Sequence, residues 1–241
     1  GKNGRSYAVW NYYYTMVSNV NYIIAAEETM GGDPELKESI IGQAYAMRAF
    51  SYFYLIQLYQ QTYKGNEEAP GVPLYSAPTQ AGSEGAPRGT VKDVYEQINS
   101  DLEKAITLLN GKEQQHPSHV DYYVANGIKA RVNLVQHNFD VAATAAAEAL
   151  KKPGLSLVSV TALGGNNSVK VDDIMWGDEI ITDHSTQYSS FFSHMDADAP
   201  GMYGSKAQQC ISTGLYNMIP NTDSRKAAWW RGPLTEEGSG S

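Results

Sequence analysis

The chain has 241 residues, 42% of them hydrophobic, and a formal net charge of −8. This charge argues against nucleic acid or an anionic membrane surface as the main partner, because phosphate groups are bound by clustered lysine and arginine side chains, and the sequence has no such cluster. The single cysteine excludes an internal disulfide, and no apolar run approaches the length of a membrane-spanning helix.

The first expected element is a helix over residues 7–30, where apolar side chains recur at positions i, i+3, i+4 and i+7. A Gly-Gly pair at 31–32 predicts the end of this helix. A second helix is expected to begin at once, because Asp33 is a suitable N-cap and Pro34 fits the first helical position.

The stretch AYAMRAFSYFYLIQLYQ at residues 44–60 contains six aromatic residues, one arginine and no acidic residue. One apolar face of the second helix is expected to comprise Leu36, Ile40, Ala44, Met47, Tyr54, Leu55 and Leu58. A second face carries Tyr45, Tyr52 and Tyr59, spaced seven residues apart. A helix that is apolar nearly all round is packed on several sides, so these rings are predicted to hold the scaffold together rather than to grip a ligand.

Arg48 is the charged side chain in this otherwise uncharged stretch. A charge that is buried without a partner is strongly destabilising, so an acidic partner is expected. Asp101 is the predicted partner, and the two residues would form a structural ion pair.

A long loop is expected over residues 63–89, which contain four prolines and five glycines. Loops of this length inside a compact domain are often functional. Within it, GVPLY at 71–75 is interpreted as a short extended piece. Thr90-Val-Lys-Asp93 matches a capping box and predicts a third helix, which Gly111 ends.

Another helix pair is expected over residues 118–153. A second capping-box pattern occupies 118–121, a tight turn is predicted at 138–140, and an alanine-rich helix at 141–152. Two helices with a short turn over this length have the dimensions of a tetratricopeptide repeat, with Phe139 expected to fill the gap at the turn. The predicted fold class is therefore mainly α, built from tetratricopeptide-like antiparallel helix pairs in an α-α superhelix.

The rest of the chain is expected to be rich in loops and to contain little strand. We predict a single domain over residues 1–241, with a helical scaffold at 7–152 and a loop-rich ligand side at 153–237. The closing GSGS at 238–241 is interpreted as a tail or scar.

No catalytic signature is present: the sequence has no nucleophile elbow, P-loop, zinc-protease helix motif or dinucleotide-binding turn. Cys210 has no neighbour that would activate a thiolate, so we interpret it as a small buried hydrophobe. The densest group of potential metal ligands comprises Asp183, His184, His194, Asp196 and Asp198. Their spacing departs from EF-hand and helical zinc patterns, so we expect no catalytic residue, no metal and no cofactor.

Aromatic residues carry the clearest functional signal, with 17 Tyr, 5 Phe and 4 Trp. Sugars have apolar C–H faces and hydroxyl edges, so their sites combine flat rings with a few placed polar groups, most often on loops. The candidate carbohydrate-binding residues are Trp10, Tyr75, Trp176, Tyr188, Phe191, Tyr203, Trp229 and Trp230. For each of them, a place in the core is an equally good interpretation.

Several stretches, in a fixed order, carry a family resemblance. They are WNYYYTMVSNVNYII (10–24), AYAMRAFSYFYLIQLYQ (44–60), GVPLY (71–75), PRGTVKDVYEQINSDLEKAITLL (87–109), ANGIKARVNLVQHNFDVAATAAAEAL (125–150) and DSR (223–225). Together they resemble the SusD/RagB family of Bacteroidetes outer-membrane lipoproteins, and the stretch at 87–109 is the closest match. One departure is the Asn-Gly pair at 126–127, where the family usually has alanines.

The resemblance implies a surface protein that binds oligosaccharides or polysaccharides and works with a SusC-like TonB-dependent transporter in nutrient uptake, without enzymatic activity. It implies a location on the cell-surface side of the outer membrane, with a lipid anchor that is expected to lie outside this sequence. Family members are longer, so the chain is expected to be truncated at both ends. The alternative function is a tetratricopeptide-like scaffold that binds a protein or peptide and has no affinity for sugar.

Overall fold

The computed structural model describes residues 4–159, 169–179, 211–224 and 226. The chain divides into two compact units, Gly1–Leu155 and Ser156–Ser241. The first unit contains helices α1 (Arg5–Ala25), α2 (Pro34–Tyr59), α3 (Val91–Leu109), α4 (Tyr122–Val135) and α5 (Phe139–Ala149), and strands β1 (Pro70–Pro73) and β2 (Arg88–Thr90). The prediction of a mainly α fold is confirmed.

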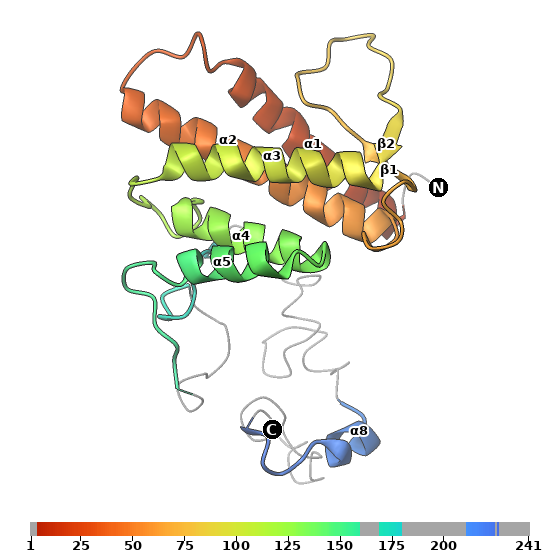
Figure 1. The fold of residues 1–241 in the computed structure, drawn as a ribbon, viewed down its shortest axis with the longest axis vertical. Coiled ribbons are helices and arrows are strands. Elements are labelled where there is room, and N and C mark those ends of the chain that lie inside the picture. Colours follow the sequence, from red (N-terminus) through yellow and green to blue (C-terminus); the bar gives the residue numbers. More distant parts are fainter. Residues whose placement is uncertain (1–3, 160–168, 180–210, 225, 227–241) are drawn as a thin grey trace, which may run out of the picture. The chain divides into compact units, whose positions relative to one another are not determined.

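The helices of the first unit pack against one another in chain order, α1 on α2, α2 on α3, α3 on α4 and α4 on α5 (Figure 1). Helices α4 and α5 form the expected pair with a short turn. Helices α2 and α3 form the other pair, with the long loop between them.

Helix α2 is the centre of this unit, and between Ala44 and Ile56 its buried side chains point to every side. The rings of Tyr45, Tyr52 and Phe53 are all buried, as the prediction of a helix packed on several sides requires. The proposed apolar face is wrong at its two ends, because Leu36 is 57% exposed and Leu58 is 56% exposed. Burial at these two positions therefore depends on what lies opposite the helix, which its own apolar pattern does not reveal.

The helix starts follow the predicted capping chemistry in two cases. The side chain of Asp33 accepts a hydrogen bond from the backbone N–H of Glu35, and Thr90 and Asp93 form the complete capping box of α3. The prediction of a capping box at 118–121 is wrong. The N-cap of α4 is Asp121, the last residue of that pattern, and its carboxylate accepts a hydrogen bond from the backbone N–H of Val124.

Strands β1 and β2 pair antiparallel and close the long loop that lies between α2 and α3. Gly71 allows this pairing, because a Cβ atom at this position would lie 2.5 Å from the carbonyl oxygen of Thr90. The Nε atom of Arg88 donates to the carbonyl oxygen of Gly71 at 2.7 Å. The loop therefore leaves and rejoins the helical unit at one fixed point.

The turn between α4 and α5 holds a non-glycine residue in the left-handed region, His137 with φ of 62°. The backbone N–H of Asn138 donates to the carbonyl oxygen of Asn133, which closes the end of α4. Phe139 does not fill the gap at this turn, contrary to expectation. Its side chain is 59% exposed and stacks on the imidazole of His137, with ring centroids 5.5 Å apart.

The described part of the second unit contains one short helix, α8 (Thr213–Met218), capped by the hydroxyl of Ser212. Lys226 connects the segment after this helix back to it. Its ammonium group donates a hydrogen bond to the carbonyl oxygen of Ile219 and lies over the ring of Tyr216.

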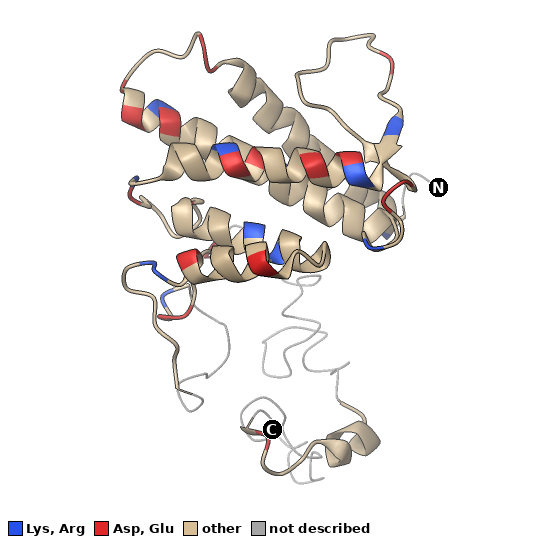
Figure 2. Ribbon diagram, viewed as in Figure 1, with Lys and Arg blue, Asp and Glu red and all other residues tan. Residues whose placement is uncertain are grey.

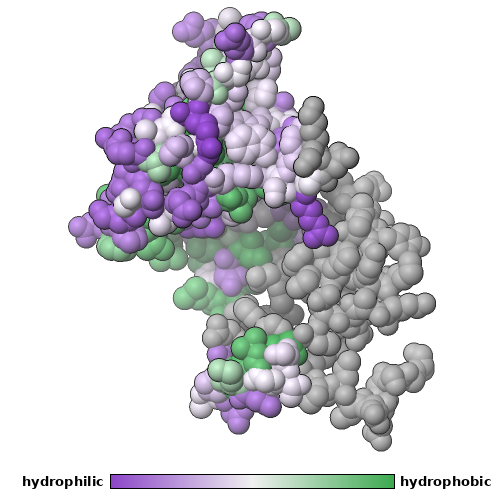
Figure 3. Space-filling model, turned by 90° about the vertical axis from the view of Figure 1, so that its right-hand side faces the viewer, coloured by the Kyte–Doolittle hydropathy of each residue, from purple (hydrophilic) through white to green (hydrophobic). Residues whose placement is uncertain are grey.

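Charged residues of both signs lie along helices α2 and α3, whereas α1 carries none after Arg5 (Figure 2). In the view of Figure 3, most of the surface over the helical unit is hydrophilic, with smaller apolar patches between. Within the described ranges, no helix is both long enough and apolar enough to span a membrane.

We expect His137→Gly to be more stable than His137→Ala by about 1 kcal/mol, because a Cβ atom is unfavourable at positive φ and glycine has none. Both variants lose the contact with Phe139, so their difference isolates the backbone effect. Urea unfolding of the two variants measures it, and equal midpoints would contradict the strained turn.

Candidate functional site

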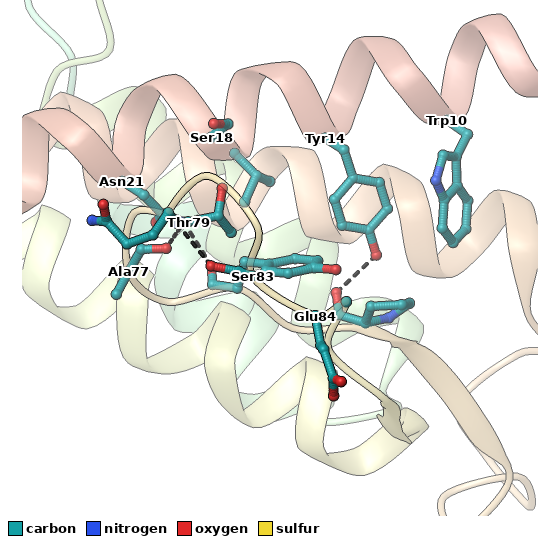
Figure 4. Close-up of a pocket in the computed structure, with 13 residues that line it drawn as sticks. Trp10, Tyr14, Ser18, Asn21, Ala77, Thr79, Ser83 and Glu84 are labelled. Carbon is teal, nitrogen blue, oxygen red and sulfur yellow. Dashed lines mark hydrogen bonds between the residues drawn. The ribbon is translucent and has the colours of Figure 1, made fainter.

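A pocket of about 390 Å³ lies between helix α1 and the loop that follows strand β1 (Figure 4). It is lined from α1 by Trp10, Tyr14, Val17, Ser18 and Asn21, and from the loop side by Pro73, Tyr75, Ala77, Thr79, Gln80, Ser83, Glu84 and Gly85. Its volume is in the range typical of small-molecule sites.

Helix periodicity explains the α1 wall. Positions 10, 14, 17, 18 and 21 follow the i, i+4, i+7, i+8 and i+11 spacing, which places their side chains on one face of a helix. Figure 4 shows Trp10, Tyr14, Ser18 and Asn21 in a row along this face. Of this row, Trp10 alone is a predicted site residue, although the same periodicity could have revealed the other members.

The rings at one end of the pocket support one another. The indole of Trp10 lies 4.7 Å from the ring of Tyr14 and meets the ring of Tyr59 edge to face at 4.9 Å. Tyr14 in turn meets Tyr75 edge to face at 5.9 Å. Because each ring is held by another, the apolar surface offered to a ligand is fixed in place.

Tyr14 connects the two walls through its hydroxyl group, which donates to the carbonyl oxygen of Pro73 at 2.7 Å. Burial raises the pKa of Tyr14 well above its usual value, and the nearby phenols of Tyr52 and Tyr75 raise it further. The hydroxyl therefore stays protonated and keeps its role as a donor.

Asn21 and Tyr52 hold the start of the loop by its backbone. The amide of Asn21 donates to the carbonyl oxygens of Tyr75 at 2.9 Å and Ala77 at 3.2 Å. The hydroxyl of Tyr52 accepts from the N–H of Tyr75 at 2.6 Å and donates to its carbonyl oxygen at 3.1 Å. The backbone groups of this part of the loop therefore form hydrogen bonds with side chains, whereas those of a helix or strand would form them with other backbone groups.

Arg48 lies at the centre of this arrangement and is only 3% exposed. Its Nε and Nη2 atoms donate to the two carboxylate oxygens of Asp101 at 2.8 and 2.7 Å, so Asp101 is the partner that the sequence predicts. Its Nη1 atom donates to Asn21 Oδ1 at 2.8 Å and to the carbonyl oxygen of Ser76 at 3.0 Å. One guanidinium thus joins α1, α2, α3 and the loop.

Burial disfavours both charges of this pair, and each charge is stabilised by the other. Desolvation raises the pKa of Asp101, against the hydrogen bonds from Arg48 and Gln97. Desolvation also opposes the charge of Arg48, but the hydrogen bond and the charge of Asp101 outweigh it and raise the pKa of the guanidinium. Each charge is therefore tolerated in the interior because the other is present.

Among the polar side chains of the pocket, those of Ser18, Thr79, Gln80 and Glu84 make no hydrogen bond with any described residue. The hydroxyl of Tyr75 accepts from the N–H of Ala86 at 3.0 Å and retains its proton for donation. The pocket therefore offers donors and acceptors beside an apolar wall, the combination that sugar binding requires.

The structure brings two of the predicted carbohydrate-binding residues, Trp10 and Tyr75, into this pocket. Trp10 lies on helix α1, whereas the preference for loop-borne rings suggested a place on a loop. Trp176 is half-buried and belongs to the second unit. The other candidates lie outside the described residues, namely Tyr188, Phe191, Tyr203, Trp229 and Trp230.

A second, more open groove of about 410 Å³ runs along α4 and α5, with one side chain from α3. It combines the apolar side chains of Ile106, Val141 and Ala145 with charged groups such as Lys129 and Glu148. In the described ranges, no three His, Cys, Asp or Glu side chains come close enough together to hold a metal ion.

We expect Arg48→Met to lower the free energy of unfolding by about 3 to 5 kcal/mol, because it leaves the buried carboxylate of Asp101 unpaired. The double variant Arg48→Met/Asp101→Leu should lose much less than the sum of the two single variants, since it removes both charges. A double-mutant cycle by urea unfolding measures this coupling, and strictly additive losses would contradict it.

The family comparison supports the assignment that the sequence suggested. The profile of the SusD-like family, described as starch-binding and associating with outer membrane, matches residues 2–134, more than half of the chain. A comparison with curated proteins finds no match.

Solved structures share the fold. A SusD-like carbohydrate binding protein from Bacteroides vulgatus ATCC 8482 is 27% identical with a TM-score of 0.68, over 73% of this chain and 38% of that one. A SusD superfamily protein from Bacteroides thetaiotaomicron VPI-5482 is also 27% identical, with a TM-score of 0.59, over 64% of this chain and 34% of that one. A laminarin binding SusD-like protein shares the fold at 21% identity and a TM-score of 0.57, over 69% and 36% of the two chains.

The chain thus spans between 34% and 38% of the length of these three proteins. The profile match extends from the start of α1 almost to the end of α4, and so includes the Arg48 pair and the whole pocket. On this match, the chain belongs to the SusD-like family.

Proposed function

We propose that this protein binds an oligosaccharide or polysaccharide without acting on it, and that the pocket between α1 and the β1–β2 loop is part of the binding site. The observation that carries the proposal is the meeting of Trp10 and Tyr75, two rings 65 positions apart in the sequence, in one pocket with free polar side chains. Apolar ring faces take up the C–H face of a sugar, and hydroxyl, amide and carboxylate groups take up its edges.

The relatives support this proposal by their own ligands. One of the solved relatives is described as a carbohydrate binding protein and another as laminarin binding. We extend to this chain the chemistry common to both, which is the binding of a glycan, and leave the choice of sugar to experiment.

We further propose that the protein acts on the cell-surface side of the outer membrane, lipid-anchored, and passes its glycan to a SusC-like TonB-dependent transporter. The description of the matched family as associating with outer membrane supports the location. The transporter follows from the resemblance of the sequence to the SusD/RagB family, and co-purification with the neighbouring outer-membrane proteins would test it.

We expect Trp10→Ala and Tyr75→Ala each to weaken glycan binding about tenfold or more, because each removes an apolar ring from the pocket, at about 25 cal/mol per Å² of buried surface. The protein would first be screened on an array of plant, host and microbial glycans. Calorimetric titration of the best oligosaccharide would then compare the variants.

Tyr12→Ala is the matched control, because Tyr12 is also an aromatic residue of α1, is 60% exposed and does not line the pocket. It should bind like the parent protein. If all three variants bind the glycan as tightly as the parent protein, the site lies elsewhere. If the protein binds no glycan on the array, the proposal of glycan binding is contradicted.

A second candidate function is a peptide-binding scaffold, favoured by the groove along α4 and α5. Stacked helix pairs present such grooves to protein partners. Binding of a partner protein that is lost on Val141→Asp, in a protein with no affinity for any glycan, would favour this alternative.

A further inference from the structure

The pocket has an uneven distribution of charge. Of the thirteen described residues that line it, Glu84 is the one with a charged side chain, and its carboxylate makes no hydrogen bond with a described residue. Glu84 lies on the long loop between β1 and β2, and Figure 4 shows its side chain extending from this loop.

The arginines near the pocket are committed to other groups. Arg48 is buried behind Asn21 and uses its guanidinium on Asp101, Asn21 and Ser76. Arg88 is close enough for its charge to act on Tyr14, but it does not line the pocket, and its Nε atom donates to Gly71. A negative group entering the pocket would therefore meet a carboxylate without a lining cation beside it.

From this arrangement we propose that the pocket takes a neutral sugar residue with free neighbouring hydroxyl groups, and selects against one that carries a carboxylate or sulfate. This inference rests on the glycan binding proposed above. Two neighbouring hydroxyls can donate together to the oxygens of Glu84, because an ionised carboxylate is purely an acceptor. Such hydrogen bonds to a charged group are stronger than those between neutral groups.

The other polar groups fit the same ligand. The side chains of Ser18, Thr79 and Gln80 can each donate and accept, as sugar hydroxyls do. An acidic sugar would place further acceptors, and a like charge, opposite Glu84. We expect its rejection because none of the described residues that line the pocket carries a positive charge to compensate.

The test uses matched pairs of ligands. Malto-oligosaccharides and laminari-oligosaccharides would be compared with the same chains oxidised at C6, where each primary alcohol has become a carboxylate. Calorimetric titration at low and high salt gives the affinities. We expect the neutral form to bind about tenfold tighter or more, with its affinity nearly independent of salt, because no ion pair is formed.

Glu84→Gln should weaken binding of the neutral ligand about tenfold. It should also reduce the ratio of the affinities for the neutral and the oxidised ligand, since the amide keeps the shape of the side chain and removes its charge. Glu113→Gln is the matched control, because Glu113 is exposed and does not line the pocket. Arg88→Gln tests whether the neighbouring cation contributes.

The outcomes separate the two proposals. Equal or tighter binding of the oxidised ligand, above all if Arg88→Gln abolishes it, would overturn the preference for neutral sugars while leaving glycan binding intact. The preference for neutral sugars would also be overturned, with glycan binding intact, if Trp10→Ala weakens binding of the neutral ligand and Glu84→Gln does not. Failure of every ligand to bind, on the array and in solution, would overturn both.

Discussion

A single buried guanidinium sets the geometry on which the rest of this structure depends. Arg48 is almost completely removed from water and must therefore satisfy its charge and its N–H groups inside the protein. It does so with a carboxylate from α3, an amide from α1 and a carbonyl from the loop. Because each partner belongs to a different segment, the cost of leaving any of them unpaired holds all four segments in place.

The loop between β1 and β2 gains most from this constraint. It makes few backbone ladder hydrogen bonds of its own, yet the carbonyl groups of Tyr75, Ser76 and Ala77 all have side-chain donors. The donors come from α1 and α2, which places the loop against α1 and creates the pocket between them. A loop ordered before binding spares the ligand the entropic cost of ordering it.

The aromatic residues have two roles, packing in the core and lining the pocket, and some of them have both. On α2, Tyr45, Tyr52 and Phe53 are buried and hold the helices together. On α1, Trp10 and Tyr14 are half-buried, and both pack on their neighbours and line the pocket. The scaffold and the candidate site are therefore continuous, and a ring that supports the fold also supplies the apolar wall for a ligand.

The local features of this protein were readable from the sequence because they depend on near neighbours. Helix periodicity, the caps at Asp33 and Thr90 and the Gly/Pro-rich loop each involve residues a few positions apart. The partner of Arg48 was also predictable, since a buried cation demands an acid and Asp101 stands on an amphipathic helix. The predictions failed where burial depended on what lies opposite, as at Leu36, Leu58 and Phe139.

The pocket itself was decided by tertiary structure alone. The sequence could nominate Trp10 and Tyr75 as rings, but their meeting depends on a loop whose path is set by hydrogen bonds from distant helices. Glu84, the charged residue of the pocket, is one acid among many in the sequence. Sequence determined the helices because periodicity is local, and the fold determined the site because its walls come from segments about 55 to 75 residues apart.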